Sequence, residues 1–222
     1  MHAVTGEYDN TLDRVFGSKR SMRIRKEWGW QMGYSKTNKA ETHSRIVRVA
    51  ARRFRERGLE GIGVADVMKE AGVTVGGFYK HFGSRDELVV EALATAFKDL
   101  DVWEKRTPDM AHLLQNYLTE AHRDAPGTGC AMGALLGDIT RGSKSARALY
   151  TERVKRTLPF FSALLPSSQR ADKRRRALLI LSALLGALNL SRAVSDPNLS
   201  REILDGVRDE LIDLVKPGSH VD

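Results

Sequence analysis

Hydrophobic residues recur at steps of three and four along most of the chain, the spacing that places them on one face of an α-helix. The first such segment begins near Asn38 and ends at Gly58, because glycine tolerates the left-handed geometry of a helix stop. Its predicted apolar stripe comprises Ile46, Val47, Val49, Ala50 and Phe54. Its remaining surface is crowded with arginines, which we expect to be solvated: Arg45, Arg48, Arg52, Arg53, Arg55 and Arg57.

Two short helices joined by a tight turn are predicted between residues 65 and 82. In the first, Val67, Met68 and Ala71 share an apolar face, and Gly72 ends the helix. In the second, which spans 74–82, Thr74 is expected to supply an N-cap hydroxyl. Spacing places Val75, Phe78 and Phe82 on its inward face and leaves five residues pointing elsewhere: Gly76, Gly77, Tyr79, Lys80 and His81. Two helices with a glycine in the turn predict a DNA-binding helix-turn-helix, whose second helix enters the major groove.

The next helix is predicted to be long and to link this motif to the rest of the chain. Ser84 and Glu87 form a capping box that opens it, and its apolar residues continue to about Arg106. A further helix is expected to start at Thr107-Pro108-Asp109, with Thr107 as its cap and proline at the first position. Its expected buried side comprises Leu113, Leu114, Tyr117 and Leu118.

The remaining segments are also helical in pattern. A short helix of small and apolar residues follows Gly127-Thr128-Gly129, and an amphipathic helix over 144–165 is expected to bend or break at Pro159. Ala177–Leu190 is apolar almost all round, and a last helix follows Ser195–Asn198. We therefore expect an all-α fold with a three-helix head. The predicted parts are an N-terminal extension (1–36), a helix-turn-helix domain (37–90), a ligand-binding and dimerisation domain (91–217) and a tail (218–222).

Composition adds a basic charge balance to this picture. The chain has 222 residues, 41% of them hydrophobic, with a formal net charge of +8 and a pI near 9.7. This balance favours a polyanion such as nucleic acid or an anionic membrane, and the helix-turn-helix pattern favours DNA. Ala177–Leu190 has 14 residues, fewer than the roughly 17–25 that cross a bilayer, and no secretory signal is apparent. We expect a cytoplasmic protein with no membrane partner.

Chemistry-bearing motifs of enzymes are lacking in the sequence. We find no phosphate-binding glycine loop, no His-Glu-x-x-His and no Gly-x-Ser-x-Gly, and the six histidines have no metal-ligand spacing. The single cysteine, Cys130, excludes an internal disulfide and Cys-rich zinc sites. We therefore expect no catalytic residues, no metal and no cofactor.

Three stretches of the motif carry a family resemblance. Ala-Gly-Val-Thr (71–74), Gly-Gly-Phe-Tyr-Lys-His-Phe (76–82) and Ser-Arg-Asp-Glu-Leu (84–88) resemble the TetR/AcrR family of transcriptional regulators over about residues 42–90. Two departures stand out: Ile62 and Gly63 occupy the place where the family usually has a serine or threonine, and Arg85 replaces a lysine. A phosphate-binding hydroxyl is therefore missing, and the arginine keeps the charge but not the shape.

Taken with the motif, the resemblance implies a dimeric regulator, most simply a repressor, that binds double-stranded operator DNA and is released by a small-molecule effector. The expected DNA-binding residues are Arg45, Arg48, Thr74, Val75, Gly76, Gly77, Tyr79, Lys80, His81 and Arg85. The two glycines offer no hydrogen bonds to bases but let the backbone approach the duplex, so shape readout is expected to contribute.

The effector site is expected among the C-terminal helices. Its predicted residues are Trp103, His112, Gln115, Tyr117, Cys130, Met132, Phe160 and Phe161, with His122 as a further polar-edged candidate. Cys130 stands at a predicted helix start, which can lower a thiol pKa and suit a sensor, but a small buried apolar residue is the commoner role.

The last two long helices are expected to form the homodimer surface, through 172–195 and 198–215. Two such helices from each of two chains make a four-helix bundle, although an intrachain core is the alternative. The basic cluster Lys19, Arg20, Arg23, Arg25 and Lys26 beside Trp28 and Trp30 suits either a DNA-contacting arm or a mobile tail. Two alternative functions remain. The first is an architectural DNA binder without a ligand, and the second, ranked below it, is an enzyme that acts on a small molecule.

Overall fold

The computed structural model describes residues 38–166 and 173–216, and these residues contain helices and no strands. The predicted all-α fold is confirmed. The N-terminal extension with its basic cluster lies outside the described residues, as does the tail. The contacts discussed below lie within the unit Arg45–Asp222. The predicted domain boundary at residue 90 falls inside this unit and stays a prediction.

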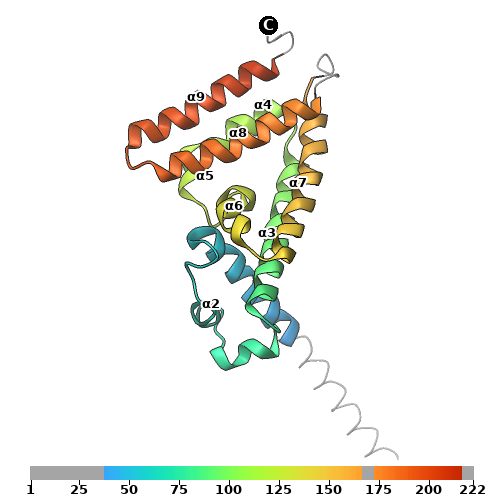
Figure 1. Cartoon of the computed structure of the whole chain (residues 1–222), viewed down its shortest axis with the longest axis vertical. Coiled ribbons are helices and arrows are strands. Elements are labelled where there is room, and N and C mark those ends of the chain that lie inside the picture. The colour runs from blue at the N-terminus through green and yellow to red at the C-terminus, as the bar shows by residue number, and fades with distance from the viewer. Residues whose placement is uncertain (1–37, 167–172, 217–222) are drawn as a thin grey trace, which may run out of the picture. The chain divides into compact units, whose positions relative to one another are not determined.

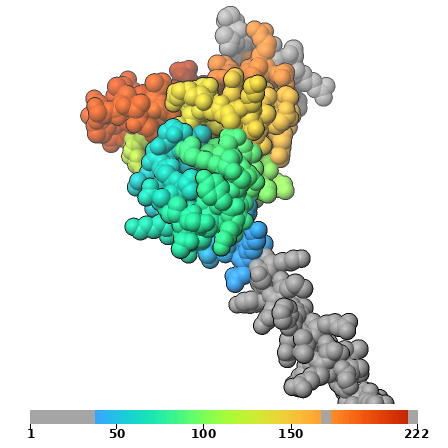
Figure 2. Space-filling model, turned by 60° about the horizontal axis from the view of Figure 1, so that its bottom comes forward, coloured from blue at the N-terminus to red at the C-terminus, as the bar shows by residue number. Residues whose placement is uncertain are grey.

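The helix-turn-helix forms as the local signals predict. A helix covers 38–57 and stops at Gly58, and α2 (Val64–Glu70) stops at Gly72, with positive φ at both glycines. The second motif helix is a 3-10 helix, η2 (Val75–Lys80), anchored by the buried rings of Phe78 and Phe82, whose centroids lie 5.4 Å apart. In Figure 2, α2 and η2 lie in one continuous surface, in the teal to green part of the colour bar.

Three details of the motif differ from expectation. Thr74 stands at the N-cap of η2, but its hydroxyl makes no capping hydrogen bond. Gly77 is buried, and a methyl group there would lie 3.2 Å from Val73 and 3.9 Å from Met68, so this glycine permits close packing of η2 on α2. The buried side of η2 is therefore centred on Gly77 and Phe78, and Val75 at its edge is 52% exposed rather than packed inward.

The long linking helix is α3 (Arg85–Arg106), as predicted. Ser84 accepts a hydrogen bond from the Glu87 amide at 3.1 Å, and the Glu87 carboxylate accepts from the Gly83 amide at 2.5 Å, one residue before the expected partner. Thr107 caps the end of α3 instead of starting the next helix. The cap of α4 (Met110–Tyr117) is Asp109, because its carboxylate accepts from the His112 amide at 2.7 Å.

The body of the fold is completed by α5 (Glu120–Asp124), α6 (Ala131–Arg141), α7 (Lys144–Leu164), α8 (Lys173–Ala193) and α9 (Pro197–Val215). In Figure 1, α3 runs beside α7, and α8 runs beside α9. Helix α7 continues through Pro159, so the proline is not a break. Asp196 caps α9 and Pro197 holds its first position.

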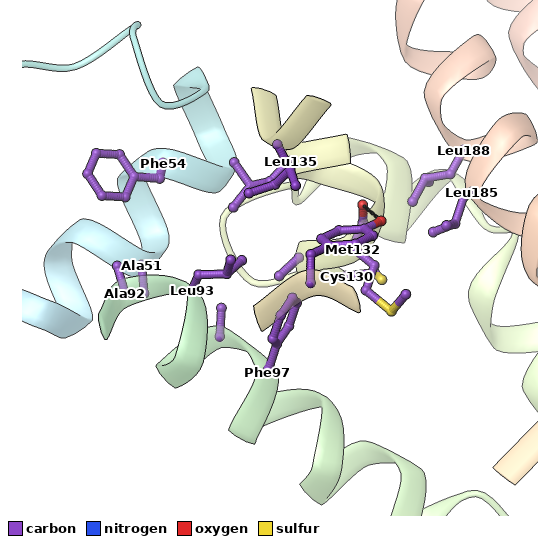
Figure 3. Close-up of a cluster of buried hydrophobic side chains, with 14 of the residues drawn as sticks. Ala51, Phe54, Ala92, Leu93, Phe97, Cys130, Met132, Leu135, Leu185 and Leu188 are labelled. Carbon is purple, nitrogen blue, oxygen red and sulfur yellow. Dashed lines mark hydrogen bonds between the residues drawn. The ribbon is translucent and has the colours of Figure 1, made fainter. Parts of the chain in front are cut away.

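The apolar core is continuous from the helix-turn-helix to the last helices. Phe54 and Leu93 of α3 belong to one cluster, which continues through Leu135 of α6 to Leu185 and Leu188 of α8 (Figure 3). A shift at one end of such a close-packed core is resisted along its whole length. The fold thus ties the DNA-binding motif mechanically to the C-terminal helices.

Helix α8 is longer than the apolar run identified in the sequence. Over its 21 residues it is, among the described helices, the one long and apolar enough to cross a membrane, yet 44% of its apolar window is buried inside the protein. Its basic start has partners: Lys173 donates to the Leu165 carbonyl at 2.7 Å and Arg176 to the Leu214 carbonyl at 2.8 Å. Both carbonyls lie near helix C-termini, where a cation is favourable.

Candidate nucleic-acid interface and effector pocket

The exposed side of η2 has the side chains for contact with a duplex. Tyr79 is 80% exposed, although its ring packs edge-on against Phe78 at 5.2 Å. Lys80 and Gly76 are exposed, and a methyl group at Gly76 would meet nothing within 4 Å. The buried phenylalanines therefore hold η2 in place while its outer side remains open to solvent.

Other predicted DNA-binding residues are engaged within the protein. Arg45 donates to the Ala71 carbonyl at the end of α2 at 2.8 Å. Arg85 donates to the Leu59 carbonyl and, at 3.1 Å, to the Glu60 carboxylate. The head is also held by Arg53, which donates to the Glu70 carboxylate at 2.6 Å and thereby lowers the Glu70 pKa. Of the remaining residues, Arg48 is exposed and His81 is half-buried.

A pocket of about 520 Å³ opens among α3, α4, α5 and the loop before α6. This volume lies in the range of small-molecule sites. Its apolar and aromatic wall comprises Ala96, Leu100, Trp103, Tyr117, Ala121 and Cys130. A second cavity of about 20 Å³ shares Leu100, Trp103, Tyr117 and Cys130 with this pocket and extends toward Met132, Phe161 and α8.

The predicted effector residues divide into three groups. Trp103, Tyr117 and Cys130 line both spaces, and Met132 and Phe161 line the smaller one. His112 and Gln115 are exposed on α4, Phe160 is half-buried on α7, and the three line neither space. Asp99 and Thr119, which the sequence did not single out, belong to the lining of the pocket.

His122 joins the end of α4 to the start of α6 beside the pocket. Its Nδ1 lies 2.7 Å from the Tyr117 carbonyl oxygen, and its Nε2 accepts the Cys130 amide at 3.0 Å. A carbonyl only accepts and an amide only donates, so the ring is neutral with its proton on Nδ1. Burial lowers the His122 pKa below its usual 6.5. The imidazole also packs edge-on against the Tyr117 ring at 4.6 Å.

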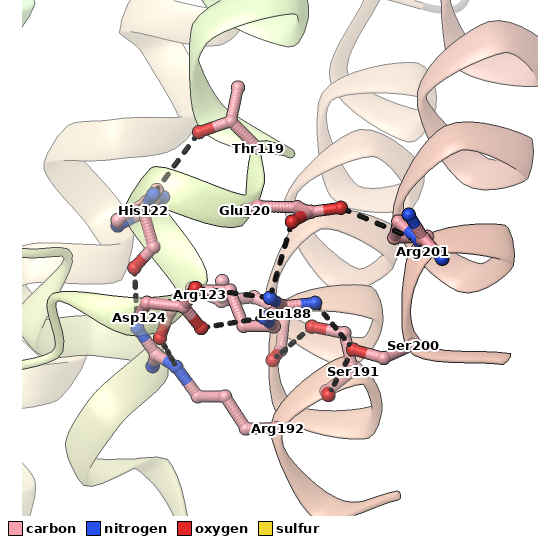
Figure 4. Close-up of polar contacts among 10 residues, drawn as sticks. All are labelled: Thr119, Glu120, His122, Arg123, Asp124, Leu188, Ser191, Arg192, Ser200 and Arg201. Atoms are coloured by element: carbon pink, nitrogen blue, oxygen red, sulfur yellow. Dashed lines mark hydrogen bonds and ion pairs between the residues drawn. The ribbon is translucent and has the colours of Figure 1, made fainter. Parts of the chain in front are cut away.

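A polar network fixes this corner to α8 and α9 (Figure 4). Arg192 donates to the His122 and Arg123 carbonyls, each at 2.9 Å, and so caps the short helix α5. Arg123 donates to the Ser200 hydroxyl at 2.9 Å, and Ser200 donates to the Ser191 carbonyl at 2.6 Å. The His122 side of the pocket is therefore tied to the C-terminal helices by hydrogen bonds as well as by apolar packing.

The neutral state of His122 predicts a loss of stability in acid. An unfolded chain protonates this histidine near pH 6.5, whereas the folded protein resists protonation, which would break the bond from the Cys130 amide. The unfolded state therefore binds more protons below pH 6.5, and the free energy of unfolding falls with falling pH by at most about 1.4 kcal/mol per pH unit from this residue.

Urea denaturation at pH 7.5 and 5.5 measures this effect. The His122→Gln variant keeps a donor and an acceptor but does not titrate, so its stability should fall less between the two pH values than that of the wild type. Equal losses in the two proteins would show that His122 does not contribute.

Arg55 connects the first helix to the pocket wall. It is 8% exposed, not solvated as expected, because it follows Val47 and Ala51 at four-residue steps on the buried side. Its guanidinium lies 3.4 Å from the Gly129 carbonyl oxygen and 3.6 Å from the Asp99 carboxylate. Asp99 and Gly129 both line the pocket. Burial lowers the pKa of Arg55, which the Asp99 carboxylate partly offsets.

No group of described histidine, cysteine, aspartate and glutamate side chains has the arrangement of a metal site. Two candidate sites thus stand out: the exposed face of η2 in the helix-turn-helix, and the largely apolar pocket beside α3.

Comparisons with known proteins agree with this arrangement. Residues 46–92 match the family of bacterial regulatory proteins, tetR family. The chain is 27% identical over 139 residues to the HTH-type transcriptional repressor DhaR of Mycobacterium sp. (strain GP1), an alignment that covers 59% of this chain and 69% of that protein.

Solved structures share the fold. A TetR transcriptional regulator from Chloroflexus aurantiacus J-10-FL has 21% sequence identity and a TM-score of 0.67, with 79% of this chain and 94% of that chain covered. A TetR-family regulator from Cytophaga hutchinsonii has 16% identity and the same TM-score of 0.67, with 82% and 98% covered. With the motif geometry, the family match and these relatives, we conclude that residues 46–92 are a DNA-binding domain of the tetR family, in a chain that has the fold of TetR-family transcriptional regulators.

Proposed function

We propose that the protein is a dimeric repressor that acts in the cytoplasm, binds a palindromic operator and releases it when a small molecule occupies the pocket. The observation that carries this proposal is the outer side of η2, where Tyr79 and Lys80 are exposed on a helix anchored by Phe78 and Phe82. Tyrosine hydroxyls and lysine ammonium groups bind phosphate oxygens and so fix a helix on a duplex. The related protein from Mycobacterium is named a repressor, which favours repression over activation here.

Selection of bound duplexes from a random library tests the proposal. A dimeric regulator should recover an inverted repeat, because two helices related by a two-fold axis meet two half-sites about one helical turn apart. An enriched single half-site would contradict the dimer. Binding without sequence preference would instead favour the architectural alternative.

Dimer formation is supported by an unburied stripe on α8. Leu179 is 53% and Leu190 is 58% exposed, and Ser182 and Gly186 between them continue the stripe at steps of three and four. A methyl group at Gly186 would meet nothing within 4 Å, so a second helix has room to approach closely. Large exposed apolar residues on one face mark an interaction surface more often than solvent contact. The neighbouring α9 adds Leu199, which is 41% exposed.

Leu179→Ala is expected to weaken the dimer by about tenfold to thirtyfold. Each substitution removes roughly 1 kcal/mol of stabilisation from apolar burial, and both protomers of a two-fold dimer carry it. Sedimentation equilibrium over a dilution series measures the dissociation constant. Val102→Ala is the matched control, since Val102 is 49% exposed but lies on α3 outside this stripe. An unchanged constant for Leu179→Ala would place the dimer surface elsewhere.

Arg55 supports a route from the pocket to the DNA. Its stem belongs to the first helix of the DNA-binding domain, and both of its polar partners line the pocket. A ligand that displaces Asp99 or the Gly129 carbonyl would remove the partners of a buried charge. The protein would then favour a different position of the first helix. A ligand changes DNA affinity only to the extent that it binds the two arrangements unequally.

A further inference from the structure

The hydroxyl of Tyr117 is a buried donor without a partner. The residue is 6% exposed, and its oxygen makes no hydrogen bond to any described residue. Its surroundings are apolar, because a methyl group at Gly133 would lie 3.6 Å from this oxygen and 3.2 Å from Leu188. Burial raises the Tyr117 pKa well above its usual value, and the adjacent Cys130 thiol, which is only a weak hydrogen-bond partner, adds to this. The hydroxyl therefore keeps its proton and is available to donate it.

A second buried tyrosine in the same core shows the usual arrangement. Tyr150 is 8% exposed, and its hydroxyl donates to the Met132 carbonyl at 2.9 Å. Buried hydroxyls are nearly always paired in this way, because an unpaired one loses its hydration without compensation. The unpaired Tyr117 hydroxyl thus carries a cost that a bound molecule would remove.

The position of Tyr117 connects its hydroxyl to the pocket. Tyr117 lines both the 520 Å³ pocket and the 20 Å³ cavity. It is flanked by Trp103 at 6.4 Å and His122 at 4.6 Å between ring centroids. Three neighbouring aromatic residues in the pocket lining favour a flat aromatic ligand, through edge-to-face and stacked contacts.

The charged side chains and the histidine of the lining already have partners. Asp99 is paired with Arg55 and has a side chain 64% exposed, and both ring nitrogens of His122 are engaged. In the smaller cavity, Arg153 and Glu104 pair with each other. Among the described lining residues, each charged side chain thus has a partner of opposite charge, and burying an unpaired charge of the ligand is costly.

We propose that the pocket takes an uncharged, largely aromatic molecule with one hydrogen-bond acceptor, such as a ketone carbonyl, which accepts the proton of the Tyr117 hydroxyl. The proposal rests on the proposed function in that this molecule would be the effector. Tyr117 is then a specificity-determining residue, which distinguishes a carbonyl compound from a hydrocarbon of the same shape.

Matched pairs of ligands test this inference on the full-length protein. The probes are aryl ketones of increasing size, from acetophenone through benzophenone to 2-acetylnaphthalene, each beside the hydrocarbon in which a methylene replaces the carbonyl. Isothermal titration calorimetry should give tighter binding of the ketone, by about tenfold, in the best-fitting pair. Tyr117→Phe should abolish this preference and leave the affinity for the hydrocarbon unchanged.

Thermal unfolding without ligand gives an independent readout. Tyr117→Phe removes an unpaired buried hydroxyl, so its Tm should rise by about 2–4 °C for each kcal/mol regained. Tyr150→Phe is the matched control: it removes a paired hydroxyl, so its Tm should fall, and the preference for ketones should persist.

Several outcomes would overturn the proposal. One is a lower Tm for Tyr117→Phe, which would mean that a water in the 20 Å³ cavity already pairs with the hydroxyl. Equal affinity of the wild type for ketone and hydrocarbon would also overturn the proposal. So would the absence of binding by every ligand in the series. Operator binding, measured separately by fluorescence anisotropy, distinguishes a failure of the proposed ligand class from a failure of the proposed function. A ketone that binds through Tyr117 without releasing DNA would refute the proposed function but not the ligand class.

Discussion

Lys80→Ala is expected to weaken operator binding by about a hundredfold. Lys80 is exposed on η2, in the part of the family match that forms the second motif helix. A charge-assisted hydrogen bond to a phosphate contributes about 1.5 kcal/mol or more, and the two protomers of the proposed dimer lose it together. The loss should be similar for all sequences, because a phosphate contact fixes position and carries no base information.

The salt dependence of binding identifies the contact as one with phosphate. Each lysine neutralising a phosphate adds about one unit to the slope of log affinity against log salt concentration, so the slope for the dimer should fall by about two. Fluorescence anisotropy with a labelled operator at several salt concentrations measures both quantities.

Lys155→Ala is the control for net charge, since Lys155 is 65% exposed on α7 and pairs with Glu152 on the same helix. If Lys80→Ala and Lys155→Ala weaken binding equally, then only the overall charge matters and the placement of η2 on DNA is wrong.

Local chemistry made the helix-turn-helix predictable. The glycine stops at Gly58 and Gly72, the apolar face of α2 and the cap at Ser84 depend on residues within one or two turns, and all of them form as expected. Where two local signals competed, the prediction was wrong: Thr107 and Asp109 both suit an N-cap, and the carboxylate of Asp109 took that position.

The polar contacts between distant segments were not predictable. Arg55 and Arg153 look like ordinary members of charged helix surfaces, yet they are 8% and 2% exposed. Their partners lie far along the chain, at Asp99, Gly129, Asp101 and Glu104. The four-residue spacing of Arg55 from Ala51 was the available signal, but only tertiary packing decides which side of a helix is covered. The pocket was foreseen only in part for the same reason, since its wall combines α3 with a loop some thirty residues further on.

Arg153→Met is expected to lower the free energy of unfolding by about 3 kcal/mol or more. Arg153 donates to the Asp101 carboxylate at 2.5 Å, to the Glu104 carboxylate and, at 3.1 Å, to the Thr157 hydroxyl. Methionine fills much of the space of the arginine stem but leaves the partly buried Glu104 carboxylate without a cation, and Asp101 with only the exposed Arg156. Removing one partner of a buried ion pair typically costs about 3–5 kcal/mol, because the remaining charge is uncompensated.

A neighbouring arginine provides a stringent control. Arg156 also donates to the Asp101 carboxylate, at 2.9 Å, but its side chain is 65% exposed. Exposed ion pairs contribute about 0–1 kcal/mol, so Arg156→Met should change stability by less than about 1 kcal/mol. Urea denaturation followed by circular dichroism compares the variants at one protein concentration, since a dimer's apparent stability depends on concentration.

The double variant Arg153→Met/Glu104→Gln separates charge from packing. Neutralising Glu104 should recover part of the lost stability if its uncompensated carboxylate is the cause, and should recover none if the loss is one of packing alone. The distinction bears on the pocket, because Asp101 and Glu104 flank Trp103 on α3. If Arg153→Met were no more destabilising than Arg156→Met, the buried cluster would not fix that wall, and the position of Trp103 would depend on the apolar core alone.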